Sequence, residues 1–119
     1  MANLNPTFSG RILFMFGFST VVVSGNSMSP AYNQGDWLVV RSLSGKKHTL
    51  KIGAVYLIQD QIRPGVKLLK RLKESRMEHG LVRYWVEGDN PSSEDSRKWG
   101  WLERDQFLKR VMLRYRKGA

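Results

Sequence analysis

The chain has 119 residues, a formal net charge of +10, 41% hydrophobic residues, 11% aromatic residues and no cysteine. This length suffices for one domain with a modest core, and the composition is that of a folded globular chain. The lack of cysteine excludes disulfides, thiolate catalysis and zinc sites with cysteine ligands. Two histidines, His48 and His79, are too few for a metal cluster, so we expect neither a metal nor another cofactor.

An apolar stretch near the N-terminus runs from Ile12 to Val23 and is interrupted by a glycine, a serine and a threonine. It is shorter than the about 20 apolar residues of a transmembrane helix, and it leads directly into a polar loop instead of a signal-peptide cleavage site. We therefore expect residues 1–17 to be an apolar lead-in and residues 18–119 to form one domain in the cytoplasm. Membrane association stays open, because three phenylalanines of the stretch could make a peripheral membrane contact: Phe14, Phe16 and Phe18.

The rest of the chain consists of short candidate strands separated by turns, with little helical periodicity. The candidates are rich in β-branched and aromatic residues, and Gly, Asn, Asp and Ser gather between them. This spacing predicts an all-β, mostly β fold with a single curled sheet or barrel-like core. The segment Lys73–His79 predicts a short helix or a hairpin tip. The six candidates are Phe18–Val23, Trp37–Arg41, Val55–Ile58, Val66–Leu72, Val82–Val86 and Phe107–Tyr115.

Ser27 is the first candidate for chemistry. It lies in a small polar loop, Ser24–Pro30, that follows an apolar run and precedes a turn at Gly35-Asp36. Such a loop between two strands can present a hydroxyl in the open. A serine needs a base to become a nucleophile, and neither histidine lies near a recognisable carboxylate partner, so the base must be another residue.

Lys70 is the candidate base. Alternate side chains of an extended Val66–Leu72 point the same way, so Lys70 is the lone charge on a face that is otherwise Val and Leu. An apolar environment lowers the pKa of a lysine, and a neutral amine beside a serine hydroxyl can act as a general base. The period alone favours the ordinary alternative, in which the lysine stem packs and its amine reaches water.

A third polar segment runs from Gly88 to Arg97 and is rich in Gly, Asn, Asp and Ser. These residues suit a structured turn held by bonds between side chains and backbone. Taken by itself, the segment is equally well explained as a polar surface loop.

Together the three segments resemble the signal peptidase I family of serine endopeptidases. Gly25-Asn26-Ser27-Met28-Ser29-Pro30 resembles the family's nucleophile box, with Gly35-Asp36 at the usual distance after it. Leu69-Lys70-Arg71-Leu72 resembles the box that carries the lysine base. Gly88-Asp89-Asn90 through Asp95-Ser96-Arg97, with Gly100, resembles the glycine-aspartate-asparagine box. The three boxes occur in the family's order.

The resemblance implies a catalytic dyad in which Ser27 is the nucleophile and Lys70 the general base. It further implies that Ser93 hydrogen-bonds the lysine amine and orients it. Asp95 and Arg97 would form an ion pair that supports the third box. The fold implied is the family's β-rich catalytic core.

The same resemblance bears on how substrate is held. Some members place a serine two residues before the nucleophile as an oxyanion donor, whereas this chain has Gly25 there, so backbone N–H groups would carry more of the oxyanion hole. Met28 would help to position the substrate strand. The partner implied is a precursor protein, bound as an extended strand beside the site and relieved of an N-terminal leader or signal peptide.

Within the family, the chain resembles the small members that include the maturation proteases of nickel-type superoxide dismutase, because its apolar stretch does not make a convincing membrane span. A membrane-associated signal peptidase, docked through the apolar N-terminus and the basic surface, is the first alternative. A self-cleaving repressor-type domain would use a related dyad, but neither a DNA-binding domain nor an internal cleavage site is recognisable.

A non-enzymatic alternative is a basic β-barrel that binds nucleic acid, because a charge of +10 attracts polyanions. The basic residues are dispersed along the chain. They are accompanied by no helix-turn-helix, zinc-finger or RNA-binding aromatic signature. We therefore expect no specific nucleic-acid partner.

Overall fold

The structure is a computed structural model, and it describes residues 2–4, 17–43 and 49–118. Most of the expected apolar lead-in, including Phe14 and Phe16, lies outside the described residues, as does His48.

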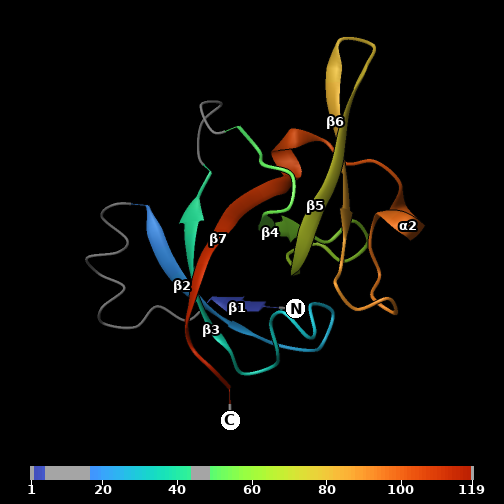
Figure 1. Cartoon of the computed structure of the whole chain (residues 1–119). Coiled ribbons are helices and arrows are strands. Elements are labelled where there is room, and N and C mark those ends of the chain that lie inside the picture. The colour runs from blue at the N-terminus through green and yellow to red at the C-terminus, as the bar shows by residue number, and fades with distance from the viewer. Residues whose placement is uncertain (1, 5–16, 44–48, 119) are drawn as a thin grey trace.

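One antiparallel sheet is the main structural element of the described chain (Figure 1). Its seven strands follow the order β1-β2-β3-β7-β4-β5-β6. A one-turn helix, α2 (Ser96–Trp99), and a 3-10 turn, η1 (Arg104–Gln106), precede the last strand. The strands are β1 (Ala2–Leu4), β2 (Phe18–Val23), β3 (Trp37–Ser42), β4 (Val55–Gln59), β5 (Lys67–Glu78), β6 (Leu81–Glu87) and β7 (Phe107–Arg116).

The expected mostly β fold is confirmed as a curled, open sheet. The two end strands, β1 and β6, do not pair with each other in the described part of the chain, so the sheet does not close into a barrel. β1 nevertheless contacts β5, which shows that the sheet curls far enough to bring one end towards its opposite side.

Strands β5 and β6 form a long hairpin that projects from the rest of the sheet (Figure 1). Of the two structures expected for Lys73–His79, the hairpin is correct and the helix is wrong. The turn is made by His79 and Gly80, which both have positive φ values, of 51° and 80°. Two central residues with positive φ fit the tight turns that join twisted antiparallel strands.

The core consists of two apolar clusters that share β4 and β5 as a common wall. Val55 and Leu57 of β4 enter the first cluster, whereas Tyr56 and Ile58 enter the second, because successive side chains of a strand point to opposite faces. β4 is therefore buried on both faces. In β5, Leu69 belongs to the first cluster, and its neighbours at positions 68 and 72 belong to the second.

Candidate active site

The loop after β2 holds Ser27 half-buried between two anchors. On one side, Met28 is buried in the first core cluster, with 1% of its surface exposed. On the other, the Ser27 carbonyl accepts a hydrogen bond of 3.0 Å from the backbone N–H of Asn90. The loop backbone is therefore fixed from the core and from the third box. Met28 anchors the loop in the structure, and its contact with a substrate strand stays a prediction.

The turn after this loop is held by Asp36, which is 3% exposed. Its carboxylate accepts hydrogen bonds from the backbone N–H groups of Asn33 and Gly118 and from the Arg114 guanidinium. Burial raises the pKa of Asp36, but these hydrogen bonds outweigh the burial and lower the pKa below its ordinary value. The turn that follows the nucleophile loop is thus tied to the C-terminal end of the described chain.

Lys70 is buried in β5, with 2% of its surface exposed. It lies between Leu68 and Leu72, which both belong to the second core cluster, as the alternation of the strand predicted. Burial lowers the pKa of the Lys70 amine, and the negative charge of Asp95 opposes that shift only in part. Among the described residues, none forms an ion pair with Lys70, so the carboxylates that raise its pKa act without a direct contact.

The structure brings Ser27 and Lys70 to the same cavity, whose volume is about 310 Å³. The rest of its wall is lined by the nucleophile loop and by two charged and one apolar residue from other segments: Ser24, Gly25, Asn26, Arg63, Glu94 and Leu68. Ser27 and Lys70, whose pKa is lowered, thus line one space. A general base must lie within hydrogen-bond reach of its nucleophile, and this contact between the two residues stays a prediction.

The third box is organised around Asp95, whose side chain is fully buried. Its carboxylate accepts hydrogen bonds from the backbone N–H of Gly88 at 2.8 Å and from Ser93 Oγ at 2.8 Å. It also forms the expected ion pair with Arg97, at 2.6 Å. Burial alone would raise the pKa of Asp95, but the hydrogen bonds from Arg97, Gly88 and Ser93 lower it to about 2.

Ser93 is held by this ion pair in the described structure. Its hydroxyl donates to Asp95, and Arg97 Nη2 lies 3.3 Å from the same oxygen. The bond from Ser93 to the Lys70 amine that the resemblance implies is not among these contacts and stays a prediction. Because the Ser93 proton is directed to Asp95, the oxygen of Ser93 keeps a lone pair with which to accept from an amine.

Two further links join the third box to the other two. The Asn90 side-chain amide donates to the Asn26 carbonyl at 3.1 Å, beside the backbone bond from Asn90 to Ser27. Arg71, which follows Lys70, binds both carboxylate oxygens of Asp89, at 2.9 and 2.7 Å. A bidentate pair of this kind fixes geometry as well as distance.

Gly88 occupies a position with no space for a side chain. A Cβ built there would lie 2.1 Å from Ser93 Oγ and 2.6 Å from the Ser27 carbonyl oxygen. The backbone φ of Gly88 is not in the left-handed region, so the need for glycine here is the close approach of the nucleophile loop.

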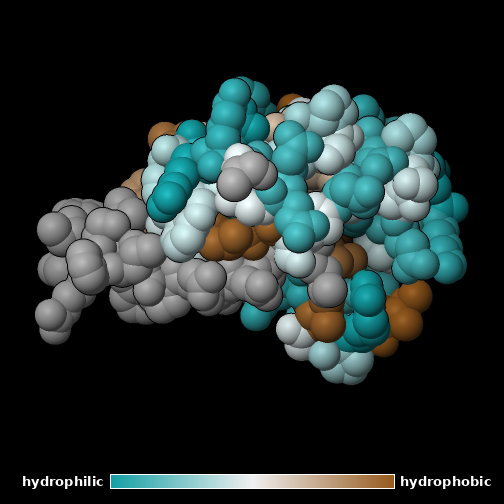
Figure 2. Space-filling model, turned by 90° about the horizontal axis from the view of Figure 1, so that it is seen from below, coloured by the Kyte–Doolittle hydropathy of each residue, from teal (hydrophilic) through white to brown (hydrophobic). Residues whose placement is uncertain are grey.

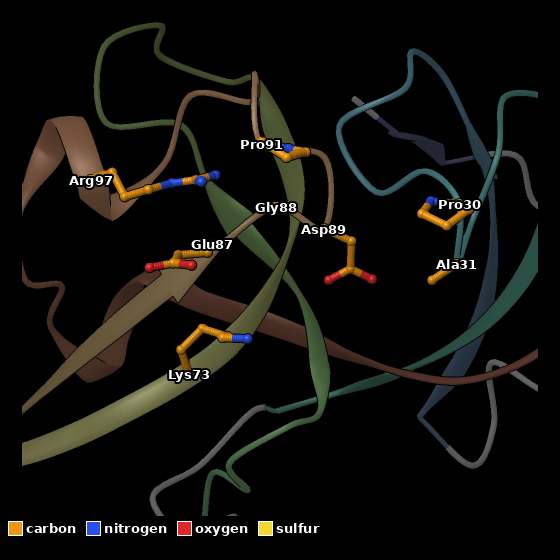
Figure 3. A pocket seen from close by; sticks show the side chains of 8 residues that line it. All are labelled: Pro30, Ala31, Lys73, Glu87, Gly88, Asp89, Pro91 and Arg97. Atoms are coloured by element: carbon orange, nitrogen blue, oxygen red, sulfur yellow. The ribbon is translucent and has the colours of Figure 1, made fainter.

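A second cavity, of about 470 Å³, adjoins the third box (Figure 3). Pro30 and Ala31 lie on one side of it, and Lys73, Glu87 and Arg97 lie on the other (Figure 3). Its lining charges are of both signs, so the cavity does not favour one sign of ligand charge.

The comparison with protein families supplies the identification. Residues 7–73, more than half of the chain, match the model of the family described as signal peptidase, peptidase S26. The chain belongs to this family. It is accordingly a serine-type peptidase of a Ser/Lys dyad family. No curated protein matches the chain. The matched range contains the first two boxes of this S26 peptidase, and the third box follows it.

The described residues of this S26 peptidase bear on the two membrane contacts considered above, a spanning helix and a peripheral contact. Within them, no helix has the length and apolar character needed to cross a membrane. Phe18, the described member of the three phenylalanines, is half-buried, with the Arg41 guanidinium 5.5 Å from its ring centre. Hydrophilic side chains cover most of the described surface in Figure 2, with small apolar patches between them. A peripheral membrane contact stays a prediction.

Sequence reasoning identified the boxes of this S26 peptidase and missed how they hold one another. Asn90, Arg71 and Asp89 lay within the quoted boxes, but no role followed for them from the sequence. Their partners are far away along the chain, so no local pattern reveals the contacts. One feature of the sequence could have indicated such a contact. Arg71 directly follows the candidate base and Asp89 lies in a polar turn, and Arg and Asp side chains can form a bidentate pair.

We expect Asp95→Ala to lower the free energy of unfolding by about 2–4 kcal/mol, because it leaves the buried Gly88 N–H and part of the Arg97 guanidinium without a partner. Urea unfolding at pH 7 measures the loss. Glu94→Ala is the matched control, since Glu94 forms an exposed pair with Lys98, and such pairs contribute about 1 kcal/mol or less.

The effect of Asp95→Ala should also depend on pH. The folded pKa of Asp95, about 2, is below the ordinary value of 3.8, so its ionised form stabilises the fold. That stabilisation is complete above pH 3.8 and is lost as the pH falls towards 2. The difference between wild type and Asp95→Ala should therefore narrow in acid. A difference that stayed constant down to pH 2 would contradict the role of the charge.

Proposed function

We propose that this S26 peptidase is a Ser/Lys endopeptidase that removes an N-terminal leader from a precursor protein. The observation that carries the proposal is the buried Lys70 amine, with a lowered pKa, lining the same cavity as Ser27. Family membership supports the class of reaction, and the shared cavity supports Ser27 as nucleophile and Lys70 as base, without a histidine.

In the proposed reaction, neutral Lys70 takes the proton of Ser27 as the serine oxygen attacks the scissile carbonyl. The backbone N–H of Ser27 donates to the oxyanion, and Gly25 adds no side-chain donor. The protonated lysine then gives its proton to the leaving amine as the peptide bond breaks. Water attacks the acyl-enzyme, Lys70 takes the water's proton, and its transfer to Ser27 releases the leader carboxylate.

Charged residues of the third box act on the pKa of Lys70. The negative charge of Asp95 raises the pKa of Lys70, and the positive charge of Arg97 lowers it. Asp60 and Glu94 raise it by smaller amounts. Because these two residues are paired at 2.6 Å, their effects on Lys70 partly cancel. The box can then hold Ser93 near the base without keeping the base protonated.

The finer proposal concerns the precursor. The resemblance of the chain to the small maturation proteases rests on its short apolar stretch and not on the three boxes, and it supports the precursor of a nickel-type superoxide dismutase as substrate. A membrane-associated signal peptidase would instead process secreted preproteins. The two proposals differ in the protein whose leader is removed, and one capture experiment separates them.

The capture uses full-length Ser27→Ala protein as bait in a host lysate, followed by incubation of the captured proteins with wild-type protein. We expect wild-type protein to cut one captured precursor at a single site near its N-terminus, which N-terminal sequencing of the product locates. A superoxide dismutase precursor would support the finer proposal, and a secreted preprotein would support the membrane alternative. If wild-type protein cut none of the captured proteins, the proposed function would be contradicted.

A further inference from the structure

The N-terminal strand β1 adds itself to the edge of β2. Ala2 pairs with Val23 and Leu4 with Val21, in antiparallel register. β1 also contacts β5 (Figure 1). One short segment therefore lies against both strands that carry the proposed dyad, since β2 leads into the Ser27 loop and β5 contains Lys70.

The edge of β2 on which β1 pairs is left open by the rest of the sheet, and part of β5 also has an open edge. β3 takes the other edge of β2, and β4 takes one edge of β5 from Lys67 to Arg71. On its other edge, β5 pairs with β6 from Arg71 onward. The first part of β5, up to Lys70, thus has an edge that is not paired with β4 or β6. An extended peptide that adds to the sheet beside Ser27 needs these same edges.

The direction of β1 is opposite to that of a leader about to be cut. A leader that lies along β2 must end at Ser27 with its scissile bond, so it runs in the direction of β2, towards the nucleophile loop. β1 runs the other way, because Ala2 lies opposite Val23 at the loop end of β2, and Leu4 lies opposite Val21, farther from the loop. A strand in this orientation covers the edge without presenting its backbone in the order that cleavage requires.

We infer that β1 is an internal plug of the substrate edge, held in reversed orientation, and that a precursor must displace it to bind. The inference rests on the proposed function, since it assigns the edge to the leader. It predicts that β1 and an extended substrate exclude each other. The measured KM would then contain the cost of releasing β1, because only the released form binds.

A disulfide lock tests the plug directly, since the chain has no cysteine of its own. Asn3 and Val22 are directly opposed in the ladder, and Cα atoms of opposed residues lie about 4.5–5.5 Å apart, within the range that a disulfide spans. In Asn3→Cys/Val22→Cys protein, oxidation should fix β1 on β2. The single variants Asn3→Cys and Val22→Cys control for the substitutions and for the oxidant.

The probe is an internally quenched ten-residue peptide with alanine at the first and third positions before the cut. We expect the oxidised double variant to cleave it more than about tenfold more slowly than the reduced form, with recovery on adding reductant. Equal rates in the two forms would overturn the plug alone. If neither wild type nor any variant cut the probe or a captured precursor, the proposed function would fail, and the plug with it.

A second variant, in which β1 is released from β2, tests the inference even if the double-cysteine variant does not fold. Asn3→Pro removes a backbone N–H from β1, which weakens strand pairing, and Asn3→Ala is its matched control. We expect Asn3→Pro to lower KM for the probe about 5- to 10-fold with kcat unchanged, because release of β1 precedes binding. A β1 that only caps an exposed sheet edge would leave KM as in Asn3→Ala, and that result would overturn the inference.

Discussion

Lys70→Met should lower kcat/KM for leader cleavage by about 10³-fold or more while leaving the fold intact. Methionine keeps an unbranched side chain in the space among the second core cluster, but it has no amine to accept the Ser27 proton. Cleavage kinetics measure the loss, and circular dichroism checks the fold. Lys67→Met, three positions earlier on β5 and only half-buried, is the matched control and should retain activity.

Lys70→Arg should fail as well, because a guanidinium stays protonated and cannot act as a base. In wild-type protein, burial lowers the pKa of Lys70 below its ordinary value of 10.5. The rate should therefore rise with pH through that lowered pKa, as the amine becomes neutral. A flat profile from acid to alkaline pH, or cleavage by Lys70→Arg, would show that another group is the base.

The lowered pKa of Lys70 should also make the free energy of unfolding depend on pH. Between the lowered folded pKa and 10.5, the unfolded chain binds more protons at this residue than the folded chain does, so this residue makes stability rise with pH. Below the folded pKa the amine is charged in both states, and the fold bears the full cost of burying it. Lys70→Met removes that cost, so its gain in stability over wild type should shrink as the pH rises towards 10.5.

The apolar neighbours of Lys70 were predictable because the alternation of a strand shows its two faces. Its burial was not, because the period alone favoured an amine that reaches water, whereas the side chain is 2% exposed. Alternation placed Lys70 with Leu68 and Leu72, and the structure has all three buried. The same strand continues to Glu78, beyond the expected end at Leu72, where both faces are exposed and the alternation disappears. A pattern that depends on one buried face cannot mark the part of a strand that projects into solvent.

The position of β1 was not predictable for a related reason. Its three residues, Ala2–Leu4, are too few to show a period. Its placement depends on an open edge of β2 that exists only after the sheet has formed. The link from Asn90 to Ser27 is similar, since it joins a turn to a loop across the fold. The sequence identifies candidate catalytic side chains, whereas the long-range hydrogen bonds and strand pairs that position them form only in the folded chain.

Ser27→Ala should abolish cleavage, with a loss of about 10⁴-fold or more in kcat. The substitution removes one oxygen from a half-buried side chain and leaves the backbone bond from Asn90 in place. The free energy of unfolding should therefore change by about 0.5 kcal/mol or less. Binding of the quenched peptide should persist in this variant, because the strand edges and the cavity are unchanged.

Ser29→Ala is the control that separates the nucleophile from a general effect on the loop. Ser29 lies two residues further along, where its hydroxyl donates to the Asn33 side chain at 2.7 Å, outside the cavity that Ser27 and Lys70 line. Its loss should leave cleavage close to the wild-type rate. If Ser29→Ala were inactive and Ser27→Ala active, the nucleophile would be Ser29. If both variants retained cleavage, the attacking group would lie outside this loop, and burial of Lys70 would need a structural explanation.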